Sequence, residues 1–307
     1  MLFRSLPITK PGIYSGVPLS KYHSAEFTPG YSVSSSNLRT MWAKSPRHMF
    51  AKWAHNPNRS DDTEETKWMR YGRACHHLFL GEDAFSTLFV QQPPTYRDVK
   101  TAEVKPWSNN ANWCKDWHKQ MRAAGRTVMT ATELEKIEPM VANLRLDPFV
   151  NSGALRGLTE HSMVVKDEQT GLWLKSRPDV IPNDGDYIDL KMTSDVTDLA
   201  VMSSIRSFGY HMQGGLCWLV CDQLKLPFTS FTLLLIETED PFCVRPVKLT
   251  DEDLSLGRRQ CRAMIRQTAA CIEVDHWPQP GEGRDLELSL SIAERESAEY
   301  RLKQEGI

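Results

Sequence analysis

Two acidic residues and a lysine lie close together in the middle of the chain, at a spacing suited to cation-dependent chemistry. Asp179 follows a proline, and ten residues later Asp189 and Lys191 flank Leu190 in an apolar segment. If this segment is a β-strand, Asp189 and Lys191 leave one face and Leu190 points into the core. Phosphodiester hydrolysis needs oxygen ligands for one or two Mg²⁺ ions and a group that positions or deprotonates water. Asp179 and Asp189 suit the first task, and Lys191 suits the second or stabilises transition-state charge.

Other polar residues near this segment add to the pattern. Glu160 stands just before the first predicted strand and offers a further carboxylate, whereas the adjacent His76 and His77 come late in an upstream helical segment. Tyr210 and Gln213, three residues apart, share one face of a helix that follows the Asp/Lys strand. Any one of these residues alone is typical of surface pairing, capping or core packing. Their combination favours nuclease chemistry.

The first half of the chain is predicted to be mainly helical. A run of Ser and Asn at residues 34–37 is a helix N-cap signal, and a proline at position 46 ends or kinks that helix before a second helical stretch. Residues 91–110, rich in Pro and Asn, are expected to form a loop. Further helices are expected at residues 64–80, stopped by Gly81, and at 111–123 and 131–146.

From residue 153 onward the pattern changes to strands. A hairpin is expected from strands 162–166 and 172–176, followed by a strand at 179–181, a turn, and the strand 187–191 that carries the Asp-x-Lys motif. Helices are then expected at 198–207, 210–221 and 250–272, with strands at 229–236 and 244–248; Gly257 argues against an unbroken last helix. This order predicts an α/β (α+β) domain with a mixed central sheet flanked by helices and a helical N-terminal region.

Length and composition are those of a globular protein. The chain has 307 residues, 40% hydrophobic content and a net charge of −2, which does not exclude a locally basic DNA-binding groove. We expect a single domain at 34–280, with a helical part at 34–150 and the catalytic sheet and helices at 151–280. An irregular N-terminal arm (1–33) and a peripheral tail (281–307, with residues from 275 on already peripheral) flank it.

The apolar stretches and the cysteine count indicate where the protein is located and which metals it could bind. No apolar stretch reaches the ~20 residues of a membrane span, and the start lacks a signal-peptide pattern, so a cytoplasmic protein without membrane contact is expected. Seven cysteines without a Cys-x-x-Cys pair indicate reduced thiols and disfavour a zinc or iron–sulfur site.

The motifs in their order along the chain resemble a known family. Gly-x-x-x-His, Glu, Arg-Pro-Asp, Asp-x-Lys and Tyr-x-x-Gln occur in this order, and together they are similar to the RecE-type (exodeoxyribonuclease VIII) branch of the RecB-like PD-(D/E)XK nucleases. The resemblance covers roughly residues 20 to 280. Each motif is weak by itself, whereas the ordered set is specific.

The resemblance implies a PD-(D/E)XK restriction-endonuclease-like core and assigns roles to single residues. His76, Glu160, Asp179, Asp189 and the carbonyl of Leu190 correspond to metal ligands, and Lys191 corresponds to the catalytic lysine. The residues that brace the site or contact DNA would be Tyr210 and Gln213, together with Arg73 and Arg177 beside the motifs. Two departures stand out: Met192 lies between the lysine and Thr193, and His77 remains a rival for His76.

The resemblance also implies an activity and its context. It indicates a Mg²⁺-dependent exodeoxyribonuclease, with Mn²⁺ as an alternative ion, that digests linear double-stranded DNA from 5′ to 3′. The 3′ single strands would then serve recombination through a single-strand annealing protein of the RecT kind, in a phage or prophage setting. Family members form rings around the duplex, so a homo-oligomeric ring is expected.

Three alternatives remain open at this stage. An iron–sulfur nuclease of the AddB kind would need clustered cysteines, and Cys243, Cys261 and Cys271 are dispersed. A DNA-end-binding or assembly subunit without nuclease activity would bind DNA and leave it intact. A PD-(D/E)XK endonuclease would share the Pro-Asp and Asp-x-Lys motifs and would cut closed circular DNA.

Overall fold

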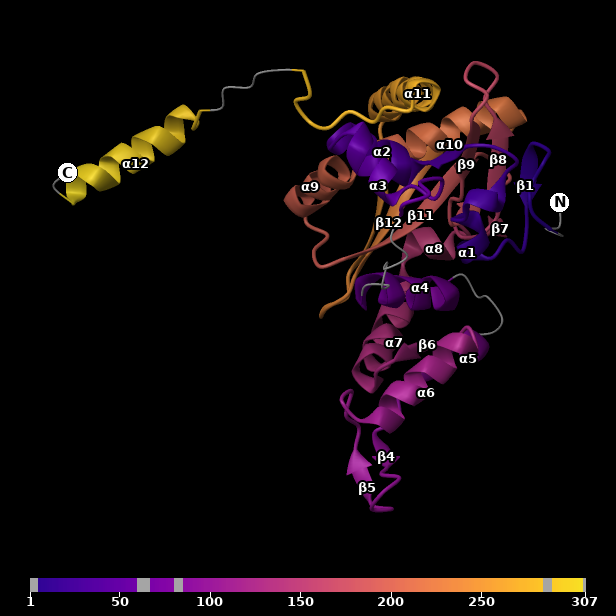
Figure 1. Ribbon diagram of the computed structural model, residues 1–307, viewed down its shortest axis with the longest axis vertical. Coiled ribbons are helices and arrows are strands. Elements are labelled where there is room, and N and C mark those ends of the chain that lie inside the picture. Colours follow the sequence, from indigo (N-terminus) through magenta and orange to yellow (C-terminus); the bar gives the residue numbers. More distant parts are fainter. Residues whose placement is uncertain (1–4, 60–66, 80–84, 284–288, 306–307) are drawn as a thin grey trace.

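A five-stranded mixed sheet forms the centre of the molecule. The computed structural model describes residues 5–59, 67–79, 85–283 and 289–305 (Figure 1). Within these ranges the sheet has the strand order β13 (Val244–Lys248), β12 (Ser230–Glu237), β11 (Asp186–Thr193), β10 (Val180–Ile181) and β7 (Leu158–Thr159). β11 and β12 are parallel and the other neighbours are antiparallel. The predicted mixed α/β architecture is therefore confirmed.

Both faces of this sheet are covered because its two long strands alternate between two cores. In β12, Phe231, Leu233 and Leu235 face one hydrophobic cluster, whereas Leu234 and Ile236 face another. The first cluster is covered by α2 (Ser35–Ala43), α3 (Pro46–Lys52), α10 (Tyr210–Leu224) and α11 (Asp251–Val274). The second is covered by α4 (Lys67–Phe79) and α7 (Ala131–Leu146). A strand buried on both faces reads as a continuous apolar run, as this one does.

A second sheet draws in the N-terminal segment. Its order is β1 (Gly12–Tyr14), β8 (Ser162–Lys166), β9 (Trp173–Ser176) and β2 (Ser32–Ser34). The prediction of an irregular arm at 1–33 was therefore wrong for its described part, which also holds α1 (Leu19–Tyr22) and a short 3-10 helix, Ala25–Phe27. Tyr14, Tyr22 and Phe27 are buried in a small core of their own. Three-residue strands between Pro and Gly residues carry too little alternation to be recognised in the sequence.

The helices mostly match their predicted places. Ser34 caps α2 in a reciprocal capping box with Asn37, and Ser45 caps α3 with Pro46 at its first position. α4 lies within the predicted 64–80, although Gly81 lies outside the described residues. The short helices α5 (Phe85–Leu88) and α8 (Pro148–Asn151), together with α9 (Asp198–Phe208), complete the body.

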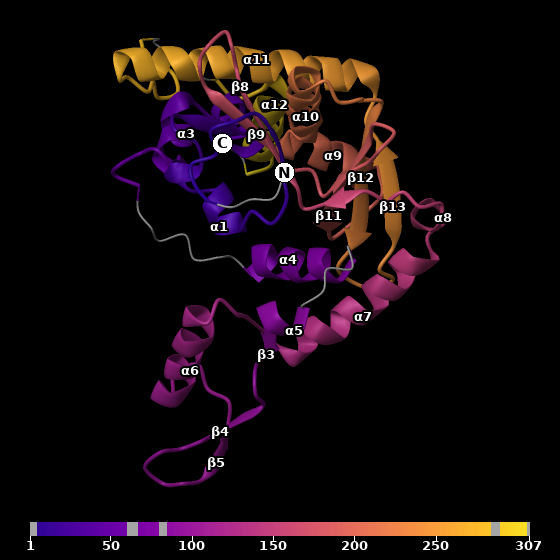
Figure 2. The same cartoon turned by 90° about the vertical axis from the view of Figure 1, so that its right-hand side faces the viewer.

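An arm projects from the body below α4 (Figures 1 and 2). It contains β4 (Thr95–Arg97), β5 (Val104–Pro106) and α6 (Asn112–Ala123), and it joins the body through the parallel pair β3 (Phe89–Gln91) and β6 (Thr127–Met129). Residues 91–110 were expected to form a loop, but β4 and β5 form an antiparallel hairpin there. The prolines around these short strands concealed it.

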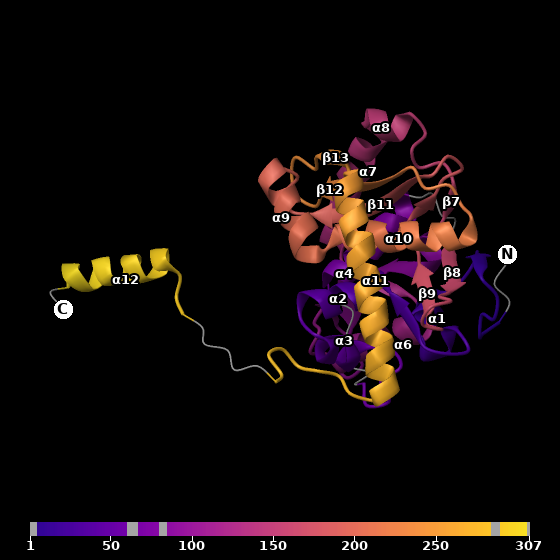
Figure 3. The same ribbon diagram turned by 90° about the horizontal axis from the view of Figure 1, so that it is seen from above.

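α11 runs unbroken through Gly257 and crosses over α10 (Figure 3), contrary to the doubt raised by that glycine. A Cβ atom at Gly257 would lie 2.1 Å from the carbonyl oxygen of His211, and one at Gly215 would lie 2.3 Å from the backbone nitrogen of Arg258. The two glycines therefore allow the backbones of α10 and α11 to approach closely.

The C-terminal part differs from a featureless tail. Trp277 is 7% exposed and stacks on Phe50 with ring centroids 4.5 Å apart, so the chain just beyond residue 275 belongs to the core. α12 (Ile292–Gln304) is helical, buries no residue and lies away from the body. None of the helices in the described ranges combines the length and apolar character required to cross a bilayer.

Candidate metal and catalytic site

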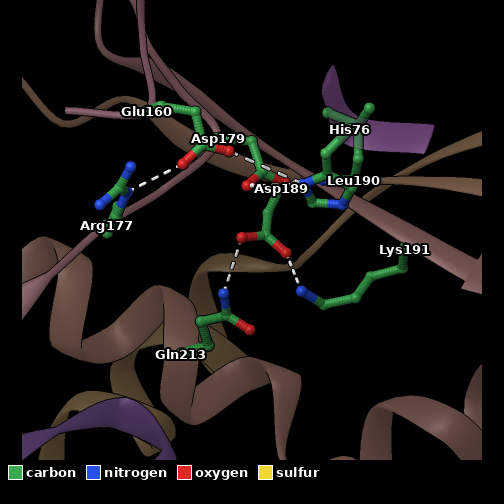
Figure 4. Close-up of polar contacts among 8 residues, drawn as sticks. All are labelled: His76, Glu160, Arg177, Asp179, Asp189, Leu190, Lys191 and Gln213. Carbon is green, nitrogen blue, oxygen red and sulfur yellow. Dashed lines mark hydrogen bonds and ion pairs between the residues drawn. The ribbon is translucent and has the colours of Figure 1, made fainter. Parts of the chain in front are cut away.

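Three potential cation ligands from distant parts of the chain converge at one edge of the central sheet (Figure 4). His76 comes from α4, Glu160 follows β7, and Asp179 precedes β10. The His76 Nδ1 atom lies 3.3 Å from Oδ1 of Asp179 and 3.9 Å from Oε1 of Glu160. One ligand atom from each residue lies within 4.8 Å of the other two.

Backbone and side-chain hydrogen bonds fix the two carboxylates. The Leu190 amide donates to Oδ2 of Asp179 at 2.6 Å, which ties Asp179 to β11. Arg177 donates through Nε to Oε2 of Glu160 at 2.8 Å and through a second nitrogen to the Val17 carbonyl at 2.9 Å. Glu160 has a left-handed backbone with φ of 54°, a conformation that non-glycine residues seldom adopt and that is often found at functional sites.

Asp189 and Lys191 form the other half of the site. They leave the same face of β11, as their spacing predicts, and form an ion pair. Gln213 of α10 donates through Nε2 to Oδ1 of Asp189 at 2.7 Å, and the Lys191 ammonium lies 5.2 Å from the centre of the Tyr210 ring. The Asp189 carboxylate thus points toward Gln213 and Lys191, and it is not part of the His76–Glu160–Asp179 cluster.

The charges of His76 and Asp179 depend on each other. Burial disfavours the charged form of Asp179, but the nearby His76, Lys191 and Leu190 amide outweigh it and hold the pKa of Asp179 below its usual range. Burial also opposes protonation of His76, but Asp179 and Glu160 raise the pKa of His76 to about 10. A cation that binds His76 must therefore displace a proton.

The Asp189–Lys191 pair is buried enough for desolvation to matter. Burial raises the pKa of Asp189 to about 6, although the Lys191 ammonium acts in the opposite direction. Burial also opposes the charge on Lys191, but Asp189 and Asp179 outweigh it and raise the pKa of Lys191. Both shifts place these groups among the perturbed ionisable residues that are typical of active sites.

The donor set is one that can hold a divalent cation. Two carboxylates and one imidazole are donor types that divalent cations accept in proteins, and water can complete the coordination. The cluster contains no cysteine, and all seven cysteines are free thiols, six of them buried.

Two predicted site residues lie elsewhere. His77, the rival of His76, packs its ring edge-to-face on Phe89 at 5.5 Å, so it is His76 that faces the carboxylates. Arg73 was expected to contact DNA or support the site, but its guanidinium bonds to Thr127 and lies over the ring of Phe89. The Leu190 side chain is in the core, and a ligand role for its carbonyl stays a prediction.

One neighbour of the site was not singled out in the sequence. Arg39 of α2 donates to the Phe208 carbonyl at 2.8 Å, and its guanidinium lies 6.0 Å from the centre of the Tyr210 ring, which also lies close to the Lys191 ammonium. Arg39 therefore supports the aromatic ring that packs beside the lysine. In the sequence, Arg39 is marked by no more than its place just after the Ser and Asn run at residues 34–37 that predicts a helix start.

Comparisons with known proteins agree with this architecture. A structure from Eubacterium rectale, provisionally described as an exonuclease, is 14% identical and superimposes with a TM-score of 0.56 over 86% of this chain and 92% of that one. An alkaline exonuclease from Laribacter hongkongensis is 15% identical over 54% of this chain and 85% of that one, with a TM-score of 0.26, too low to carry an argument. No curated protein matches.

A family model settles the relationship. It matches residues 34–287, which include every element that contributes to the site, and it describes a PDDEXK-like domain of unknown function, DUF3799. The match covers well over half of the chain, and the fold and the Asp179, Asp189 and Lys191 geometry are consistent with it. The chain therefore belongs to the DUF3799 family of PDDEXK-like domains, within the PD-(D/E)XK nuclease superfamily.

Proposed function

We propose that this protein is a Mg²⁺-dependent exodeoxyribonuclease that degrades linear double-stranded DNA. One observation carries the proposal: the cation-ligand cluster of His76, Glu160 and Asp179 lies beside the buried Asp189–Lys191 pair. Phosphodiester hydrolysis needs both a cation that neutralises charge and a group that acts on the attacking water. A purely structural ion-pair network has no need for three cation ligands around one point.

Each residue has a distinct task in this proposal. His76, Glu160 and Asp179 would hold the cation, and Mg²⁺ or Mn²⁺ bound there would supply a positive charge to the scissile phosphate. Lys191, whose ammonium pairs with the Asp189 carboxylate and lies 5.2 Å from the centre of the Tyr210 ring, would position the water or stabilise negative charge on the phosphate. Asp189 is a further candidate ligand, once its carboxylate leaves Gln213 and Lys191.

Arg177 and Gln213 act as positioning residues. Arg177 fixes Glu160, and Gln213 fixes Asp189, each by a direct hydrogen bond. Such supporting contacts orient ligands and commonly affect affinity for a metal by 10- to 100-fold. We therefore assign these two residues to site support.

The family resemblance supports the finer parts of the proposal. It points to 5′ to 3′ digestion that leaves 3′ single strands for an annealing protein of the RecT kind, within phage or prophage recombination. A homo-oligomeric ring around the duplex and a cytoplasmic location belong to the same proposal.

The first test compares two substrates in Mg²⁺: a linear duplex labelled at either its 5′ or its 3′ ends, and a covalently closed circle. We expect loss of the linear duplex alone, with early release of the 5′ label. An Asp179→Asn variant, folded by circular dichroism, should be inactive. Cutting of the circle would assign an endonuclease. Binding of linear DNA without cleavage by the wild type would assign an end-binding or assembly subunit.

A further inference from the structure

The arm, residues 92–126, differs in charge from the rest of the chain. It contains seven Lys or Arg residues against three Asp or Glu residues, a net charge of +4, whereas the whole chain has a net charge of −2. The remainder of the protein must therefore carry −6. A basic segment on an otherwise acidic protein attracts a polyanion to that part of the surface.

The basic side chains of the arm that could bind a polyanion lie on α6. In the hairpin, Lys105 is already paired with Asp98 at 2.7 Å and with Glu103 at 3.7 Å. Lys115, Lys119 and Arg122 follow one another at helical spacing, so they form a stripe along one side of α6. All three are exposed, and among the described residues they take part in none of the ion pairs found.

An aromatic cluster packs the parts of the arm together. Trp107, between the hairpin and α6, packs edge-to-face on Trp117 at 5.2 Å and on Trp113 at 6.0 Å, and Trp113 stacks on Tyr96 of β4 at 6.1 Å. The rings therefore join α6 to the hairpin. The basic stripe is presented on a folded unit, so its backbone is already in place when a ligand binds.

The root of the arm is fixed to the helix that bears His76. Arg73 of α4 bonds to Thr127 of β6 and lies 5.8 Å from the ring centre of Phe89 of β3, and His77 packs on the same ring. Figures 1 and 2 show the arm projecting just below α4. The arm is thus positioned relative to the proposed cation site.

We propose that Lys115, Lys119 and Arg122 form a second contact for duplex DNA, in which they bind the phosphate backbone away from the scissile bond. The inference rests on the proposed function for the identity of the polyanion. In this proposal, the stripe on α6 holds the uncut part of the duplex beside the proposed cation site. Backbone contacts of this kind position a nucleic acid without reading its sequence.

The test measures binding separately from cleavage. A fluorescein-labelled duplex is titrated in EDTA with the wild type and with Lys115→Gln/Lys119→Gln/Arg122→Gln, and fluorescence anisotropy is recorded over a range of salt concentrations. Because each phosphate contact adds about one to the slope of log K against log [salt], the slope should become shallower by about three. Affinity at low salt should fall at least ~10-fold.

A matched control removes three exposed lysines from the body, Lys166→Gln/Lys225→Gln/Lys248→Gln, and should retain the wild-type slope. Wild-type binding and slope in the arm variant would overturn the inference, even if the enzyme cuts DNA. A changed oligomeric state with unchanged DNA binding would assign the stripe to a protein contact and also overturn it. A wild type that cuts no DNA, but whose binding depends on the stripe, would reject the proposed function and keep the second contact.

Discussion

Asp179 is the residue on which the charges of the site depend. It is 7% exposed, contacts His76 at 3.3 Å and accepts a hydrogen bond from the Leu190 amide. A buried carboxylate of this kind is stable only while its partners remain, because an unpaired buried charge is strongly destabilising. The Asp179 carboxylate therefore links the protonation of His76, the binding of a cation and the stability of the fold.

The protonation of His76 gives the first prediction. In metal-free protein the His76 pKa is raised to about 10 by Asp179 and Glu160, so NMR titration in EDTA should show a protonated ring at neutral pH. Asp179→Asn should lower that pKa by roughly one to three units. Asp116→Asn, a change at an exposed carboxylate, serves as the control. A His76 pKa near 6.5 in the wild type would contradict the observed geometry.

The raised pKa of His76 also determines how this residue's contribution to the stability of the fold changes with pH. The folded-state pKa of His76 lies above the unfolded value of 6.5, so the folded protein holds the proton more tightly. This stabilisation is fully present below pH 6.5 and is lost as the pH rises toward about 10. Bound Mg²⁺ should oppose this trend, because cation binding improves as the proton leaves.

Lys175 should make the free energy of unfolding change with pH in the opposite direction. Its side chain is 3% exposed, donates to the Tyr22 carbonyl at 2.6 Å and lies 4.9 Å from the Tyr22 ring centre and 5.0 Å from that of Phe27. Burial lowers the Lys175 pKa from 10.5 to about 7, so the unfolded state binds more protons between these values. Stability should therefore rise with pH across this window.

The measurement is urea denaturation at several pH values between 7 and 10, in the wild type and in Lys175→Met. The difference in unfolding free energy between the two proteins should change steadily with pH, because the variant has no proton to lose at this position. A constant difference would show that Lys175 keeps its ordinary pKa in the folded protein.

At the scale of elements, the crossing of α10 and α11 is held at a backbone separation that only glycine permits. Gly257→Ala should destabilise the fold by about 1–3 kcal/mol or more, because its Cβ would meet the His211 carbonyl at 2.1 Å. Gly72→Ala in α4 is the matched control: its Cβ meets nothing within 4 Å, and it should stabilise by roughly 0.5–1 kcal/mol. Urea denaturation of both variants tests the pair.

How far the sequence predicts an element depends on where its stabilisation comes from. β11, β12 and α10 could be predicted because runs of buried apolar residues specify them. The β4–β5 hairpin could not, because its strands are three residues long and depend on contacts with α6. Likewise, Asp179, Asp189 and Lys191 stood out by type and spacing, whereas Arg39 and the orientation of Asp189 depend on tertiary packing.

At the scale of the whole molecule, the C-terminal region should divide into an essential and a dispensable part. Trp277 is buried between Phe50 and Trp53, with ring centroids at 4.5 and 5.4 Å, so Trp277→Ala should cost about 3–5 kcal/mol. A chain ending at residue 283 keeps Trp277 and loses α12, which buries nothing. It should unfold at the wild-type midpoint, and a large loss of stability would show that α12 contacts the body.

A cation bound by His76, Glu160 and Asp179 would connect α4 to the central sheet. His76 comes from the helical half of the chain, and Glu160 and Asp179 come from the sheet half. A bound ion would therefore add a cross-link between layers that also meet through apolar contacts and through the direct contact of His76 with Asp179. Ligand binding to the native state stabilises whatever must be in place to bind it. In hydrogen–deuterium exchange, Mg²⁺ should therefore slow the amides of α4 but not those of α12, and Asp179→Asn should abolish the difference. Equal exchange of α4 with and without the ion would mean that the two halves stay joined without it.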